Sequence, residues 1–115
     1  MKLIIGNQIF SAALENNSST AALKEKLQQG PITIHMEDYA RMEKVGSFDF
    51  HLPTNDQQTT TKAGDLILYL GNSFVIYYAP NSWRFTRLGQ IENVTAGDLK
   101  KVLGRGDVDV TLSLD

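Results

Sequence analysis

Residues 64–91, GDLILYLGNSFVIYYAPNSWRFTRLGQI, constrain the fold more than any other stretch of the chain. Two nearly continuous apolar runs, LILYL and FVIYY, flank a Gly71-Asn72 pair, and Gly-Asn is a favoured pair for a two-residue hairpin turn. The sequence therefore predicts a β-hairpin in which Tyr69 lies opposite Phe74. Because both faces of this hairpin are apolar, we expect both to be covered, one by a barrel interior and the other by a helix.

Two helices are expected from local signals. Good helix formers fill residues 21–29, and Gly30 and Pro31 stop the helix there, with Leu23 and Leu27 on its buried face. The second helix follows residues 95–98, TAGD, which resemble a capping box with Asp in place of Glu. Its apolar stripe is formed by Leu99, Val102 and Leu103.

The remaining segments predict a mainly β protein. Apolar runs and period-two alternation favour strands at residues 2–5, 8–14, 32–36, 42–52, 85–91 and 108–113. Polar residues predict loops at 37–41 and 53–62. Many short strands with two isolated helices indicate a closed β-barrel of about eight strands, with the two short helices at its ends. Residues 105–107, Arg-Gly-Asp, spell an adhesion tripeptide, which we interpret as the turn between the second helix and the last strand.

Length and composition exclude several classes of protein. The 115 residues fit a single domain, 1–115, and the formal net charge of −2 gives no basic excess for binding nucleic acid. The chain has no cysteine, which excludes disulfides, iron–sulfur clusters and thiolate zinc sites. No apolar run is long enough for a membrane span. We expect a cytoplasmic protein, unless a signal peptide was removed.

An aromatic and arginine-rich group follows the central hairpin. Aromatic rings beside arginines are suited to anions, planar rings and peptide backbones. An earlier polar stretch contributes further charged residues, which serve either as a pocket wall or as a solvated loop. We expect a groove that binds a small molecule or an extended peptide, lined by Arg41, Glu43, Tyr78, Trp83, Arg84 and Arg87.

Arg87 has a structural explanation beside the functional one. Strand alternation places it on an apolar face, so it needs an acidic partner, either Glu43 or another acid. A salt bridge that spans the barrel accounts for this residue as well as ligand binding does.

Of the other candidate groups, His35 and His51 would meet if adjacent strands align, and Glu37 or Asp49 would then complete a metal site. The two histidines lack metal-ligand spacing, however. We therefore expect no metal site and no cofactor.

Several short tracts resemble a known family. They are GDL at 64–66, FVIYY at 74–78 and FTRLGQI at 85–91, with EK at 43–44, LPT at 52–54 and GDV at 106–108. The chain is similar, over nearly its whole length, to bacterial cyclophilin-like domain proteins of unknown function. The resemblance implies a compact eight-stranded barrel with two helices. True cyclophilins isomerise X-Pro bonds with a strand arginine followed by an aromatic and Gln-Gly-Gly tract, which this chain lacks; residues 41–48 come nearest and do not match.

Three functions are consistent with this sequence. The leading one is a binding module that acts as a monomer or weak homodimer, without membrane or nucleic-acid partners. The alternative is a peptidyl-prolyl isomerase with an atypical active site, in which an arginine would stabilise the twisted amide; a shared fold alone does not establish it. The third is a structural subunit that associates through an exposed sheet edge.

Overall fold

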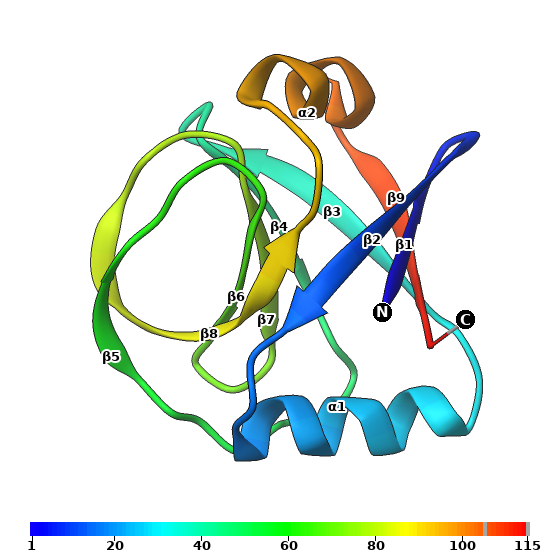
Figure 1. Ribbon diagram of the computed structural model, residues 1–115, viewed down its shortest axis with the longest axis vertical. Helices are drawn as coiled ribbons and strands as arrows, with labels where there is room; N and C mark the ends of the chain where they lie inside the picture. Colours follow the sequence, from blue (N-terminus) through cyan, green and yellow to red (C-terminus); the bar gives the residue numbers. More distant parts are fainter. Residues whose placement is uncertain (105, 115) are drawn as a thin grey trace.

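This computed structural model describes residues 1–104 and 106–114. They form nine strands and two helices, joined by turns and loops (Figure 1). The predicted turn at 105–107 contains residue 105 and so lies partly outside the described residues. In chain order the elements are β1 (Lys2–Ile5), β2 (Gln8–Leu14), α1 (Ser18–Gln28), β3 (Ile32–Tyr39), β4 (Glu43–Ser47), β5 (Gln57–Thr60), β6 (Asp65–Tyr69), β7 (Ser73–Tyr77), β8 (Ser82–Ile91), α2 (Ala96–Leu103) and β9 (Val108–Ser113).

Eight of these strands close into an antiparallel barrel. Their order is β2-β1-β9-β3-β4-β7-β6-β8, and β8 pairs back onto β2. The closing pair is short, with Ala12 opposite Ile91, Ala13 opposite Gln90 and Leu14 opposite Gly89. The remaining strand, β5, pairs with the first half of β8. This architecture confirms the predicted mainly β fold, a closed barrel of about eight strands with two short helices.

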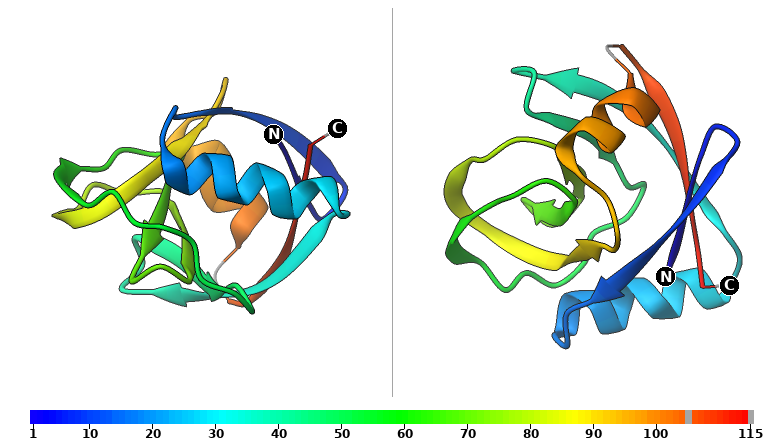
Figure 2. Two further views of the ribbon diagram at one scale, coloured as in Figure 1. Left: turned by 90° about the horizontal axis from the view of Figure 1, so that it is seen from below. Right: turned by 45° about the horizontal axis from the view of Figure 1, so that its top comes forward.

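The two helices lie at opposite ends of the barrel, α1 at the bottom of Figure 1 and α2 at its top; Figure 2 shows α1 from below. Leu23 and Leu27 of α1 are buried in the main core, as predicted, and so are Leu99 and Leu103 of α2. The helix that was predicted at 21–29 begins three residues earlier, at Ser18. Its start is set by Asn17, whose side chain accepts a hydrogen bond from the Thr20 backbone N–H.

The central hairpin, β6–β7, has a different register from the predicted one. Tyr69 lies opposite Ser73 and not opposite Phe74, so the loop has three residues. In this loop the residues with positive φ are Leu70 (56°) and Gly71 (81°), whereas the predicted turn pair was Gly71-Asn72. The observed register pairs Leu68 with Phe74 on the core side, where the predicted one would have mixed core and outer residues.

The outer face of this hairpin is covered by strand and not by helix, which corrects the sequence-based expectation. Ile67, Val75 and Tyr77 pack with Phe85 of β8 into a second apolar cluster, separate from the main core. A register shift between Leu66 and Ile67 bends the β6–β8 pair. As a result, β8 and β5 curve round on the left of Figure 1. The curled sheet partly covers its own outer face and leaves a pocket there.

Two polar segments that we expected to be loops contain strand. β3 continues to Tyr39 because residues 37–39 pair with β4. β5 forms at Gln57–Thr60, where its four polar residues pair with β8. Conversely, the strand expected at 42–52 stops at Ser47. In the first two places, backbone pairing supplied by neighbouring strands outweighs the local composition. β4 ends at Ser47 because its partner β7 begins opposite it, at Ser73.

Candidate functional site: an apolar pocket with a buried carboxyl group

A pocket of about 430 Å³ opens on the face of the sheet opposite the main core. We call it the outer pocket. Its floor is a row of side chains from three adjacent strands, because Val75 of β7 lies opposite Val45 of β4 on one side and opposite Ile67 of β6 on the other. Phe85 of β8 completes the floor. Strand alternation therefore gives the outer pocket a continuous apolar base.

Three exposed aromatic side chains form the rim of the outer pocket. Tyr39, Tyr69 and Trp83 line it and are 62%, 36% and 59% exposed. Each comes from a different strand, β3, β6 and β8 respectively. Large apolar side chains that stay exposed around a concave apolar surface are typical of binding sites.

The third part of the outer pocket is polar and consists of Glu43, Tyr77 and Asn81. Glu43 and Tyr77 lie opposite each other on β4 and β7, and the Asn81 side-chain amide donates a 3.0 Å hydrogen bond to the Tyr77 hydroxyl. Glu43 is only 8% exposed. No described residue forms a hydrogen bond of regular geometry with its carboxyl group. Since no fully buried polar side-chain atom lacks a partner in the described chain, the Glu43 oxygens must reach solvent, and they do so at the outer pocket.

Burial determines the ionisation of these groups. Burial raises the pKa of Glu43; the nearby Tyr77 hydroxyl opposes this rise and the charge of Asp38 adds to it. Burial also raises the pKa of Tyr77 to about 12, so at neutral pH this residue is a phenol. Its oxygen accepts from Asn81, and the Glu43 carboxyl group acts on the same hydroxyl as a hydrogen-bond partner. The polar end thus offers a carboxyl group beside a hydroxyl donor.

Family comparison fits this architecture. A model of the Cyclophilin-like family matches residues 3–113, from β1 to the end of β9. The chain belongs to the Cyclophilin-like family. Comparisons with curated proteins and with solved structures give no match. Neither helix in the described part of this cyclophilin-like chain has the length and apolar character needed to cross a membrane.

The cyclophilin-like barrel brings together two of the six predicted site residues. Glu43 and Trp83 both line the outer pocket. Arg84 follows Trp83 on β8, where alternation turns it to the other face, and it is exposed opposite Gln58 of β5. Sequence reasoning missed the rim tyrosines, Tyr39 and Tyr69. Ligand binding by any of these residues remains a prediction.

Arg41 and Tyr78 lie together at a separate depression that Asp38 also lines. The Tyr78 hydroxyl donates to the Asp38 carboxylate. The ammonium of Lys44, a fully buried side chain, lies 3.2 Å from the same carboxylate and donates to the Gly106 carbonyl at 2.5 Å. Burial would raise the pKa of Asp38, but the Tyr78 and Lys44 hydrogen bonds outweigh it and lower that pKa. This network ties the β3–β4 hairpin to the segment before β9.

Arg87 lies in a neighbouring depression, which shares Phe85 with the outer pocket but none of its other lining residues. Its Nη1 lies 2.9 Å from Asp65 Oδ2 and its Nη2 3.3 Å from Asp65 Oδ1, while Nε lies 3.3 Å from Glu15 Oε1. Asp65 is fully buried. The acidic partner that the sequence requires is therefore Asp65, with Glu15, and not Glu43. A salt bridge is present, as predicted, but it joins the neighbouring strands β6 and β8 and does not span the barrel.

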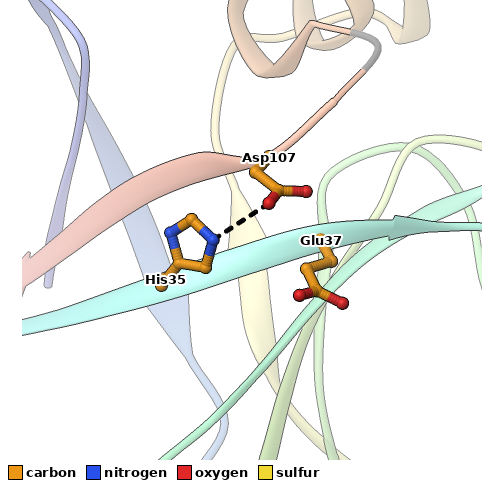
Figure 3. A group of neighbouring side chains, drawn as sticks. All are labelled: His35, Glu37 and Asp107. Atoms are coloured by element: carbon orange, nitrogen blue, oxygen red, sulfur yellow. Dashed lines mark hydrogen bonds and ion pairs between the residues drawn. The ribbon is translucent and has the colours of Figure 1, made fainter.

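A further polar cluster surrounds His35 on the exposed surface of β3 and β9 (Figure 3). His35 Nδ1 lies 2.8 Å from Asp109 Oδ1, and its Nε2 lies 3.1 Å from Asp107 Oδ2. Ligand atoms of His35, Glu37 and Asp107 lie within 4.8 Å of one another, close enough to share a metal ion. His51 is elsewhere, beside Gly71, so the two histidines are not neighbours. The absence of a metal site remains a prediction.

We expect His35 to stabilise this cyclophilin-like domain in acid more than in base. Hydrogen bonds that the ring donates to Asp109 and, to a lesser extent, Asp107 raise the pKa of His35. A raised folded-state pKa gives stability that is fully present below the unfolded value of about 6.5 and is lost as pH rises through the folded value. Urea unfolding should therefore show His35→Gln to be more destabilising at about pH 5 than at about pH 9. The matched control is His51→Gln; an equal His35→Gln effect at both pH values would contradict the prediction.

Proposed function

We propose that this cyclophilin-like domain is a binding module whose outer pocket takes a small molecule or an extended peptide. The observation that carries the proposal is Glu43, a residue only 8% exposed whose carboxyl group reaches solvent through a mainly apolar pocket. Covering such a group without a partner of opposite charge is unfavourable. A ligand that fills the pocket and contacts the carboxyl group accounts for its position.

Size and lining also support binding. A volume of about 430 Å³ lies within the range of about 300–1,000 Å³ that is usual for ligand pockets. An apolar floor supplies binding energy through surface burial, and a few polar groups set the orientation of a ligand. The exposed ring of Trp83 is placed to cover a bound molecule.

The isomerase alternative receives less support. It requires an arginine that donates to the twisted amide, and none of the described residues that line the outer pocket is an arginine. Arg87 is held by Asp65 and Glu15, and Arg84 lies on the other face of β8. These placements favour binding over isomerisation.

We expect Trp83→Ala to weaken ligand binding at least ten-fold, because truncating a tryptophan that covers a bound ligand costs about 2 kcal/mol or more of affinity. Backbone amide NMR with a fragment library should first locate the ligands, with shifts concentrated on β4, β6 and β7 around the outer pocket. Affinities of wild type and variant are then measured for the fragments found.

The matched control is Ile9→Ala, which truncates an apolar side chain that is 66% exposed on β2 and does not line the outer pocket. Its fragment affinities should equal those of wild type. Shifts centred on Arg87 or on Arg41, or fragment binding that Trp83→Ala leaves intact, would show that the outer pocket is not the site.

A further inference from the structure

We propose that the ligand of the outer pocket carries an organic ammonium group on an apolar body. This inference rests on the proposed binding function and names the chemistry of the ligand. The ammonium would lie against the Glu43 carboxylate, and the aromatic rim would enclose the apolar part. Three properties of the outer pocket lead to this class of ligand: its charge, its aromatic lining and the cost of desolvating Glu43.

The first property is charge. Among the described residues that line the outer pocket, Glu43 is the only one with a formal charge at neutral pH. No cation of the described residues is among the charges that shift the pKa of Glu43. Two cations on neighbouring strands are engaged elsewhere: Lys44 binds Asp38 and the Gly106 carbonyl, and Arg87 binds Asp65. Lys44 also lies on the opposite face of β4 from Glu43. The pocket therefore presents an uncompensated negative charge, which repels an anion and attracts a cation.

The second property is the aromatic lining. Tyr39, Tyr69 and Trp83 surround the opening, and Tyr77 and Phe85 lie deeper, with their ring centroids 5.7 Å apart. The faces of aromatic rings carry negative electrostatic potential, and a ring of them around a carboxylate is an arrangement that holds ammonium groups. A neutral ligand would gain from the same rings through burial alone.

The third property is the cost of desolvation. A neutral apolar ligand that covered the outer pocket would cut Glu43 off from water and leave its charge unpaired. An ammonium group removes that cost because it supplies both the opposite charge and hydrogen-bond donors. The Tyr77 hydroxyl, held by Asn81, adds a polar contact beside the carboxylate. The pocket therefore discriminates by charge as well as by shape.

Three ligands that share one aromatic body test the inference directly. They are phenethylammonium, 2-phenylethanol and 3-phenylpropanoate, which differ in charge and little in size. The chain has one tryptophan, Trp83, at the rim, so its fluorescence reports occupancy of the outer pocket. We expect the wild-type protein to bind the cation at least ten-fold more tightly than the alcohol, and to bind the anion most weakly.

A charge-removing variant provides the second measurement. Glu43→Gln keeps the shape of the side chain and should weaken phenethylammonium binding at least ten-fold. It should strengthen 2-phenylethanol binding, because the charge that the alcohol would cut off from water is gone. Glu92→Gln removes the same charge from an exposed position that does not line the outer pocket, and should change neither affinity. If Glu43→Gln does not fold, the comparison of the three ligands on the wild-type protein still decides the question.

The source of the ammonium is distinguished with a short peptide, Phe-Ala-Ala-amide, with a free or an acetylated amino terminus. Tighter binding of the free peptide than of phenethylammonium identifies an extended peptide terminus, and the reverse identifies a small amine. Equal binding of cation and alcohol, unchanged by Glu43→Gln, would overturn the ammonium inference and leave the proposed function standing. Failure of all three ligands and of a wider fragment library to bind would overturn both.

Discussion

Gly89→Ala is expected to destabilise the barrel by more than about 3 kcal/mol, the upper end of the usual cost of overpacking. Gly89 lies on β8 opposite Leu14, where the barrel closes. A Cβ atom added there would lie 2.2 Å from the Ala13 carbonyl oxygen and 3.0 Å from Leu14 Cα. Both are backbone atoms, so no rotation of a side chain relieves the contact. The two strands must move apart, and their pairing consists of three residue pairs.

Urea unfolding of wild type, Gly89→Ala and Gly97→Ala measures this effect. Gly97 is the matched control, because it is exposed near the start of α2 and an added Cβ would meet nothing closer than Thr95 Oγ1 at 3.7 Å. Gly97→Ala should be neutral or stabilising by up to about 1 kcal/mol, from helix propensity. A Gly89→Ala protein as stable as wild type would mean that β2 and β8 do not approach this closely.

Local signals were enough to predict the helices and their caps. Asn17 caps the first helix, and the box that Thr95 and Asp98 were predicted to form is present in full. Each cap depends on residues within four positions of one another, so sequence order already places them together. The register of β6–β7, by contrast, is not determined by local signals. Gly71 suits either central position of a hairpin turn, and the choice was made by packing of Leu68 and Phe74 in the core.

The candidate site could be predicted only in part, because the residues that form it are brought together by the order of the strands. Sequence proximity grouped Arg84 and Arg87 with Trp83, yet the structure places both arginines outside the outer pocket. Tyr39 and Tyr69 reach the outer pocket from β3 and β6, which are separated in the sheet by β4 and β7. Nothing in the local sequence indicates that neighbourhood. Once the correct register is known, the alternation of Ile67 with Tyr69 on β6 predicts the rim and floor together.

Arg87→Ala is also expected to destabilise the protein strongly, lowering its free energy of unfolding by about 3 kcal/mol or more. The variant leaves the Asp65 carboxylate fully buried, with the Lys62 backbone N–H at 2.9 Å as its remaining hydrogen bond from the described residues. Hydrogen bonding to Asp65 raises the pKa of Arg87, as expected for a cation paired with a carboxylate. Removing one member of a buried ion pair is costly because the other charge stays desolvated.

Three comparison variants separate this explanation from a general loss of packing. Asp65→Ala should cost less than Arg87→Ala, since Arg87 is 29% exposed and keeps Glu15 as a partner. The double variant Asp65→Ala/Arg87→Ala should be more stable than Arg87→Ala alone, because no buried charge is left unpaired. Arg84→Ala, on the exposed face of the same strand, should change stability by less than about 0.5 kcal/mol. If Arg87→Ala were as mild as Arg84→Ala, the ion pair would not be structural, and Arg87 would again be a candidate for ligand binding.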